Sequence, residues 1–224
     1  MIVSVHLVEA GWRRAPGMLR YQPDPADVPG MTYAEAALST PLRQGAVPRP
    51  GPGRFGLIAA WEDDGALDDF LASHPLAKRL AEGWHARLVP VRLYGHWAGM
   101  PELPKRETPV DDAEPVAVLT LGRPRISRAA PFLKASAPAE RAASAHPAVL
   151  ASTALARPPR FVSTFSLWRS AGEMREYAAS AEGPHQAAVE ADHARPFHHE
   201  SAFVRFRPYA SEGKWDGRDP LATA

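Results

Sequence analysis

Two stretches of this chain resemble each other, RFGLIAAW (residues 54–61) and RFVSTFSLW (residues 160–168), and their likeness decides the fold. Both end in tryptophan, and in both an aromatic residue follows nine positions later and a serine twelve positions later. Each copy then reaches a proline, an apolar segment and a turn of the form Gly-x-Trp-x-Gly, at residues 95–99 and 213–217. Self-similarity at a separation of about 107 residues is too long for a solenoid and predicts two homologous units in one chain.

The hydrophobic periodicity predicts the same series of elements in each unit. Strands are predicted at 2–9, 33–40, 55–61 and 87–94 in the first unit and at 116–121, 149–155, 161–168 and 201–207 in the second. Helices are predicted in the proline-rich stretch after the first strand, over 65–83 with Trp84 on its apolar side, within 126–145, and over 172–194 with a break before Pro184. Each unit therefore has the ferredoxin-like order β-α-β-β-α-β, in an α+β fold.

A ferredoxin-like sheet carries its helices on one face, so two units can bury both bare faces by packing sheet on sheet as an α/β barrel. We expect a first unit at residues 1–100, a proline-rich linker at 101–115, a second unit at 116–217 and a tail at 218–224. Duplication builds the barrel within one chain, which allows a monomer or a homodimer. Between the halves we expect an apolar hollow that can receive a ligand.

The composition excludes several classes of site. The 224 residues include no cysteine, which excludes disulfides, zinc–thiolate sites, iron–sulfur clusters, thiolate-ligated haem and cysteine nucleophiles. The 26 basic and 25 acidic residues give a net charge of +1, too weak a field for nucleic-acid binding. No apolar run approaches the ~18 residues of a membrane span, and the N-terminus lacks a signal-peptide pattern, so we expect a cytoplasmic protein.

No P-loop, no Gly-x-Gly-x-x-Gly turn and no Gly-x-Ser-x-Gly elbow occurs in the sequence. The reactive groups that remain are nine histidines, the carboxylates and the arginines. Among the histidines, His185 follows a Gly-Pro pair at the start of a predicted helix, and helical spacing puts Ala188, Val189 and Asp192 on its side. An imidazole on such a face of small residues leaves room for a flat partner such as a porphyrin. The alternative is a histidine that only bonds a backbone carbonyl near the helix start.

A second histidine cluster, His193, His198, His199 and Glu200, precedes the last predicted strand. In an extended segment His198 and Glu200 share a face, and together with a distant histidine they form the pattern of a two-His-one-carboxylate iron site. The alternative is an exposed polar turn between helix and strand.

Three arginines, Arg123, Arg125 and Arg128, follow the strand predicted at 116–121. Because guanidinium pairs well with carboxylate, they are candidates for contact with the propionates of a porphyrin or with its distal pocket. The alternative is a solvated loop. Trp168 ends a strand of the second unit, where either packing or stacking on a cofactor fits its indole.

These features together resemble the spheroidene monooxygenase-like proteins. The resemblance is strongest over residues 54–99 and 116–217, and it includes the Ser-Leu-Trp strand end, the Gly-Pro-His helix start, the two Gly-x-Trp-x-Gly turns and the segment LGRPRISRAAPF (residues 121–132). It implies the dimeric α/β-barrel superfamily, which also holds chlorite dismutases, dye-decolorising peroxidases and aldoxime dehydratases. The first 50 residues match the family more loosely.

The resemblance implies a haem (heme) cofactor and oxidation of an apolar, carotenoid-like substrate by O₂ or peroxide, with an electron donor that the sequence does not identify. In several haem-binding members of the superfamily the proximal histidine comes from a helix of the second half, where His185 stands. His185 is therefore expected to bind the iron, Arg123, Arg128 and Trp168 to contact the haem, and Arg125 to act at the distal face. Two alternatives stay open: a non-haem or cofactor-free oxygenase using His198 and Glu200, and a non-enzymatic haem or small-ligand carrier.

Overall fold

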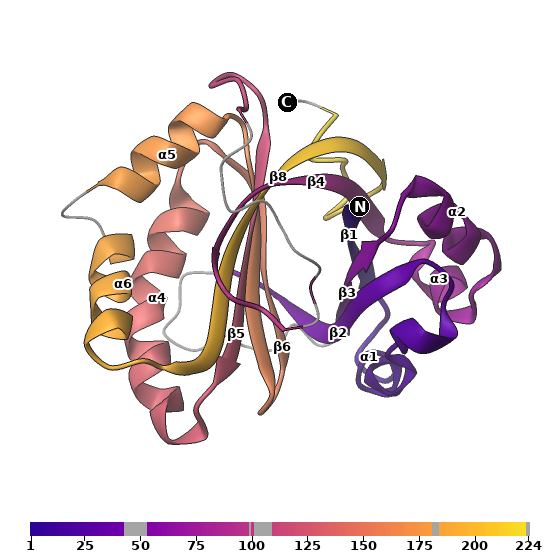
Figure 1. Cartoon of the computed structure of the whole chain (residues 1–224), viewed down its shortest axis with the longest axis horizontal. Coiled ribbons are helices and arrows are strands. Elements are labelled where there is room, and N and C mark those ends of the chain that lie inside the picture. The colour runs from indigo at the N-terminus through magenta and orange to yellow at the C-terminus, as the bar shows by residue number, and fades with distance from the viewer. Residues whose placement is uncertain (43–52, 99, 101–108, 181–183, 223–224) are drawn as a thin grey trace.

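The computed structural model describes residues 1–42, 53–98, 100, 109–180 and 184–222 of the chain (Figure 1). Eight antiparallel strands form a closed barrel in the order β1-β3-β2-β6-β7-β5-β8-β4. The first half contains β1 (Ile2–Glu9), α1 (Ala15–Met18), β2 (Met31–Pro41), β3 (Arg54–Trp61), α2 (Asp64–Ser73), α3 (Pro75–Leu80) and β4 (Trp84–Gly95). The second half contains β5 (Val116–Pro124), α4 (Ala129–Ala145), β6 (Val149–Arg157), β7 (Phe161–Trp168), α5 (Ala171–Ala179), α6 (Pro184–Ala194) and β8 (His198–Gly213).

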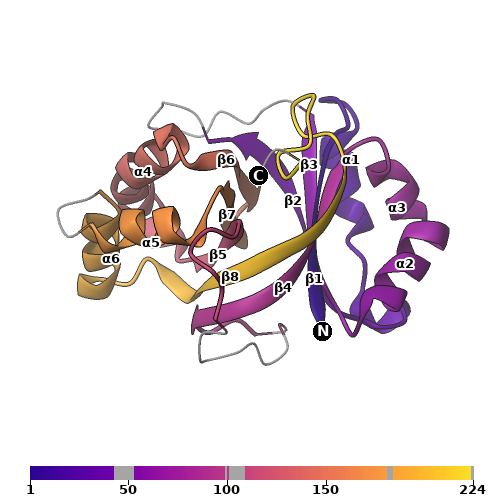
Figure 2. The ribbon, with the colours of Figure 1, turned by 90° about the horizontal axis from the view of Figure 1, so that it is seen from above.

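The predicted barrel with outer helices is confirmed, and it closes through two hydrogen-bonded seams. Within the halves the strands follow the orders β4-β1-β3-β2 and β8-β5-β7-β6, so corresponding strands occupy corresponding places. The seams are the antiparallel pairs β2–β6 and β4–β8. Helices α1, α2 and α3 lie on one side of the barrel and α4, α5 and α6 on the other (Figure 2).

The helix predicted over residues 65–83 is wrong in its extent. It is two helices, α2 and α3, with extended backbone at His74 (ψ 136°), because the ring of Pro75 disfavours helical geometry in the residue before it. The His74 Nδ1 atom accepts a hydrogen bond from the amide of Leu76 and so caps α3. Trp84 does not belong to this helix but begins β4, and its indole packs inward against Phe165.

The side chains that point into the barrel fill it. Among the described residues, those of the central cluster are almost fully buried, which does not match the apolar hollow expected between the halves. The physical reason is size, since aromatic side chains from both halves meet across an eight-stranded barrel that is only wide enough for side chains. The largest fully buried members of the cluster are Trp84, Phe161, Phe165, Phe206, Ile58, Leu88 and Leu119.

The two Gly-x-Trp-x-Gly turns close opposite ends of the β4–β8 pair. Trp97 lies after the end of β4 and packs on Phe161 at 5.9 Å between ring centroids, whereas Trp215 lies after the end of β8 and packs on Trp84 at 5.2 Å. Each turn begins at a glycine with positive φ, 85° at Gly95 and 86° at Gly213. A Cβ at either position would also collide with a neighbouring carbonyl oxygen, so both turns need glycine.

Several sequence predictions fall partly outside the described residues. The linker predicted at 101–115 includes residues 101–108, and the glycine before Pro184 belongs to 181–183. No helix in the described part of the chain is both long and apolar enough to cross a membrane.

Candidate functional site

The side chains on the helix-facing surface of the sheet are buried to different degrees in the two halves of the barrel. In the first half the outward residues of β3, Phe55, Leu57 and Ala59, are fully buried beneath the helices. In β7 the corresponding positions, counted back from the terminal tryptophan, are Val162, Thr164 and Ser166, and all three remain partly exposed. The second helical layer therefore does not seal its sheet.

The same partial exposure extends to the strands on either side of β7. We call the following partly exposed, outward residues the open sheet face: Val118 and Thr120 of β5, Ser152, Ala154 and Ala156 of β6, and Val162, Thr164 and Ser166 of β7. Its side chains are small, and α4 and α6 pack mainly against each other beside it. In Figures 1 and 2 these helices stand over the same side of the sheet. The arrangement offers a ligand a surface that the first half has filled with its own side chains.

His198 stands at the edge of the open sheet face. It begins β8, its side chain is 12% exposed, and its ring lies 4.8 Å from that of Phe132 in α4. Both ring nitrogens are buried, and neither has a hydrogen-bond partner in the part of the chain that the structure describes. A buried polar atom without a partner costs about 1–3 kcal/mol, so this ring is suited to a partner from outside the chain.

Two neighbours fix the His198 ring in place. The Asp192 Oδ1 atom of α6 lies 3.6 Å from His198 Nδ1 and accepts a hydrogen bond of 2.8 Å from the amide of Phe197. On the opposite edge, a Cβ placed on Gly122 would lie 2.8 Å from His198 Nε2, so only glycine admits the ring here. The Nε2 edge thus rests on β5 beside Val162 of the open sheet face.

Burial dominates the charge state of this imidazole. Burial lowers the pKa of His198 below its ordinary value, and the nearby Asp192 carboxylate raises it only in part. The ring is therefore neutral at pH 7. Glu140 of α4 shows the same effect of a low-dielectric layer, since burial raises the pKa of its carboxyl group above its ordinary value against the opposing influence of Ser136 and Arg141.

His185 is the second residue of α6. Its side chain lies outside the described residues, and so does that of His193. Positions 185 and 192 share one face of α6, because seven residues make two helical turns.

The three arginines do not converge. Arg123 donates from Nε to Glu200 Oε2 at 2.7 Å and places its guanidinium 4.6 Å from the ring centre of Trp97. Arg125 is exposed and donates from Nε to the carbonyl of His198 at 3.0 Å, while Arg128 stacks over Phe197 at 5.5 Å. Arg125 and Arg128 therefore belong to the segment around His198, and Arg123 belongs to the turn at the barrel end.

Trp168 lies at the other end of the open sheet face. It is 2% exposed, donates from Nε1 to Ser166 Oγ at 3.0 Å, and packs against the rings of His146 and Tyr177 at 5.3 and 5.1 Å. Burial raises the pKa of the Tyr177 hydroxyl, which donates to the carbonyl of Ala139.

His198 and Glu200 do not form the iron site that their spacing suggests. The register between β5 and β8 shifts between Arg123 and Pro124, so the two side chains have different surroundings. The Glu200 carboxylate accepts hydrogen bonds from the amide of Ala98 and from Arg123, while His198 packs on Phe132. No group of three or more histidine and carboxylate side chains placed to hold a metal ion occurs within the described residues.

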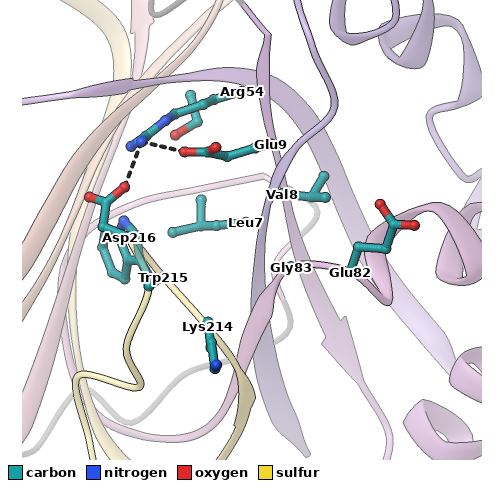
Figure 3. Close-up of a pocket in the computed structure, with 11 residues that line it drawn as sticks. Leu7, Val8, Glu9, Arg54, Glu82, Gly83, Lys214, Trp215 and Asp216 are labelled. Atoms are coloured by element: carbon teal, nitrogen blue, oxygen red, sulfur yellow. Dashed lines mark hydrogen bonds and ion pairs between the residues drawn. The ribbon is translucent and has the colours of Figure 1, made fainter.

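A separate pocket of about 310 Å³ lies at the end of the barrel closed by Trp215 (Figure 3). There the Arg54 Nη2 atom lies 2.5 Å from Glu9 Oε1 and 2.5 Å from Asp216 Oδ1, which ties the segment after β8 to β1 and β3. None of the site residues predicted from the sequence lines this pocket. Its arginine is already neutralised, so we assign the arrangement to structural closure.

The sequence pointed to His198 but not to the carboxylate beside it. The His-x-Glu spacing suggested a metal pair with Glu200, whereas the residue beside His198 is Asp192, six positions earlier on the preceding helix. The signal that could have found the pair is an acidic residue in the last turns of a helix followed closely by a histidine. The glycine that makes room for the ring, Gly122, comes from another strand and carries no such signal.

No protein-family model matches the chain. It is 36% identical over 200 residues to the spheroidene monooxygenase of Rubrivivax gelatinosus, an alignment that covers 85% of this chain and 73% of the relative. It is 29% identical over 188 residues to that of Cereibacter sphaeroides, covering 81% of this chain and 57% of the relative. The protein from Rhodobacter capsulatus is 28% identical over 186 residues, covering 80% and 77%. The chain thus spans little more than half the length of the Cereibacter relative.

Among solved structures, the crystal structure of an aldoxime dehydratase superposes with a TM-score of 0.55 and 9% sequence identity, covering 99% of this chain and 86% of that one. At that identity the superposition shows a shared fold alone. The Rubrivivax relative, by contrast, combines identity above 30% with more than two thirds coverage of both chains. The chain therefore belongs to the spheroidene monooxygenase family.

Proposed function

We propose that this protein is a haem-dependent monooxygenase that oxidises a C–H bond of an apolar, carotenoid-like substrate with O₂ or peroxide. The observation that carries the proposal is the open sheet face, a partly exposed surface of small side chains beneath helices that carry His185 and Asp192. Family membership supports the reaction class and the carotenoid character of the substrate. The electron donor is not identified.

The residues of the second half fit a haem. With no cysteine in the chain, imidazole is the side chain best suited to bind the iron, and a buried imidazole with unpartnered nitrogens lies at the edge of the open sheet face. We propose that His185 would hold the iron, from the α6 face that also carries position 192. Haem supplies the activation of O₂ or peroxide.

The protein's own side chains supply orientation and a dry surface. Val118, Val162 and Ala154 present apolar surface to the substrate, while Thr120 and Thr164 satisfy one another through an Oγ1–Oγ1 hydrogen bond of 2.7 Å. Pairing of these two hydroxyl groups with each other makes this part of the sheet face better suited to an apolar ligand.

Four further side chains keep the proposed roles that the sequence suggests. Arg125 is assigned to the distal face, and its guanidinium adjoins the carbonyl of His198. Arg128 is assigned to a propionate, for which its exposed segment is suited. The contacts of Arg123 with Glu200 and of Trp168 with Ser166 must open or extend before either residue reaches a haem, so these two assignments are the most demanding.

The domain assignment belongs to the same proposal. We take residues 1–100 and 116–217 as duplicated ferredoxin-like repeats, joined by a linker at 101–115 and followed by a tail at 218–224. The matching strand orders of the two halves support this division. A monomer or homodimer in the cytoplasm is the setting that we propose for the enzyme.

Oxygen incorporation tests the reaction. Haem-loaded protein, supplied with spheroidene and ¹⁸O-labelled hydrogen peroxide, is expected to yield an oxidised carotenoid that carries the label, because peroxide replaces both O₂ and the unidentified donor. His185→Ala is expected to abolish the labelled product. Tight haem uptake without any turnover would instead identify a haem carrier, a role with which the filled barrel interior is compatible.

A further inference from the structure

The segment between β1 and β2 presents a surface that the fold itself does not use. Its sequence over residues 10–22, AGWRRAPGMLRYQ, contains three arginines and no acidic residue. Ala15 and Met18 of α1 are buried in the core of the first half. On the solvent side, Trp12 is 64% exposed and Tyr21 is 53% exposed. The segment is therefore amphipathic, with arginines and aromatic rings on its outer side.

Helix α3 extends this outer surface. The Arg79 guanidinium lies 4.8 Å from the ring centre of Tyr21, which ends a 3-10 turn (Leu19–Tyr21) directly after α1. Arg13 stacks on Trp12 in the same way, at 4.9 Å. Figure 1 shows α1 and α3 together on the side of the molecule away from α4, α5 and α6. We call the following exposed side chains the basic–aromatic patch: Trp12, Arg13, Arg14, Arg20, Tyr21 and Arg79.

The fold does not balance the positive charge of the basic–aromatic patch. Within the described residues none of its four arginines has an ion pair, whereas Arg54 and Arg87 each bind two carboxylates. Helix α3, PLAKRL, contains two basic residues and no acidic one. Because the whole chain has a net charge of only +1, this surface is a local concentration of positive charge. Such a surface attracts an anionic partner.

We propose that the basic–aromatic patch docks on the surface of a lipid bilayer that contains anionic lipids. Tryptophan and tyrosine rings lie at the level of the lipid headgroups, and arginines beside them are attracted to anionic headgroups. The apolar side of the segment is already buried in the protein, so the contact is peripheral and reaches only as deep as the two rings. This inference goes beyond the proposed function and does not depend on haem.

The layout of the patch favours lipid over an acidic protein. Its arginines come from the loop before α1, from the 3-10 turn and from α3, and both aromatic rings stand exposed. Lipid headgroups diffuse to wherever the charges are, whereas an acidic protein must match the position of each one.

Cosedimentation with vesicles tests the docking. The purified protein is expected to bind vesicles of phosphatidylcholine and phosphatidylglycerol in equal parts, to bind pure phosphatidylcholine far less, and to be released by salt. Arg13→Gln combined with Arg20→Gln is expected to weaken binding by roughly tenfold or more. The matched control is Arg207→Gln, since Arg207 is an exposed arginine of β8 outside the patch. That variant is expected to bind as wild type does.

Tryptophan fluorescence locates the contact without relying on the arginine variants. Trp12 is the exposed member of the six tryptophans, because the other five are at most 8% exposed. Brominated lipids in the anionic vesicles are therefore expected to quench the emission of Trp12. Trp12→Phe is expected to keep an aromatic ring in the patch and to lose most of this quenching.

Each outcome decides the proposal. Binding to anionic vesicles together with quenching of Trp12 supports it. Equal binding to both kinds of vesicle, no binding to either, or binding without quenching of Trp12 overturns it. If the protein binds soluble polyglutamate but neither kind of vesicle, the patch serves an acidic protein and the proposal is wrong. The vesicle assays need no haem, so their failure leaves the proposed function standing, and a failure of haem uptake leaves the docking standing.

Discussion

At the residue scale, His6 shows how a buried histidine is accommodated when it has a partner. Trp61 Nε1 donates to Ser4 Oγ at 2.9 Å, which leaves the hydroxyl hydrogen free for His6 Nε2 at 2.9 Å. Burial, followed by the positive charges of His85 and Arg87, lowers the pKa of His6 to about 3. His6 therefore stays neutral in the fold at pH values where the unfolded chain is protonated.

His6 makes the stability depend on pH below about 6.5, the ordinary value. Between that pH and about 3 the unfolded state binds a proton that the folded state does not, so stability falls by about 1.4 kcal/mol per pH unit from this group as the pH drops. Urea unfolding of His6→Leu from pH 7 to 4 is expected to show a shallower loss than wild type. His199→Leu, which removes an exposed ring, is the control and is expected to keep the wild-type slope. Equal slopes for wild type and His6→Leu would contradict this assignment.

The sequence could supply only part of the candidate site. His185, Arg125 and Arg128 could be proposed because helix starts and basic clusters are local patterns, and these assignments stay predictions. The contact of His198 with Gly122 joins β8 to β5, and pairing across strands distant in sequence leaves no local signal. The open sheet face was missed as well. The sequence shows that Thr164 and Ser166 are polar residues of an alternating strand, but it does not show that the helices leave them partly exposed.

At the element scale, β3 and β7 occupy equivalent places but differ in burial. Leu57 is fully buried beneath the first helical layer, whereas Thr164 remains partly exposed. Leu57→Ala is expected to cost about 2–5 kcal/mol of unfolding free energy, because it leaves a cavity. Thr164→Ala is expected to cost about 1 kcal/mol, the hydrogen bond with Thr120. Denaturant unfolding of both variants measures the contrast, and equal losses would show that the second sheet face is sealed after all.

The turn after β8 gives a second element-scale prediction. Gly213 has φ of 86°, and a Cβ there would lie 1.9 Å from the carbonyl oxygen of Gly83, so Gly213→Ala must displace backbone and is expected to lower the melting temperature. Gly17→Ala is the matched control, since Gly17 lies in α1 with nothing within 4 Å of a Cβ. Alanine is the better helix former by about 1 kcal/mol, so the control is expected to be neutral or stabilising. A Gly213→Ala protein as stable as wild type would contradict the turn geometry.

The order of strands and helices was the most predictable part of the fold. Apolar alternation located all eight strands, because a two-residue period is visible wherever one face of a strand is buried. The prediction of one helix over residues 65–83 was wrong. The helical spacing of the leucines continues through His74, but the backbone there is extended and separates α2 from α3. The position of Trp84 in β4 depends on its contact with Phe165 in the other half, which spacing cannot reveal.

At the scale of the whole molecule, the barrel interior joins the halves into one core. Phe165 of β7 packs against Trp84 of the first half at 6.2 Å and against Trp215 at 6.1 Å. Phe165→Ala is expected to cost about 3–5 kcal/mol and to speed amide hydrogen exchange in β3 as much as in β7. Faster exchange confined to the second half would show that the halves unfold independently.

Haem binding in the second half through His185 is the central element of the proposed function. The direct measurement is the absorption spectrum of the purified protein during titration with haemin, for wild type and for His185→Ala. We predict a shifted Soret band that saturates in the wild type and that is lost or displaced in the variant, because the variant lacks the nitrogen proposed to hold the iron. A wild-type protein that leaves the haemin spectrum unchanged, or a variant with the wild-type spectrum, would contradict the account.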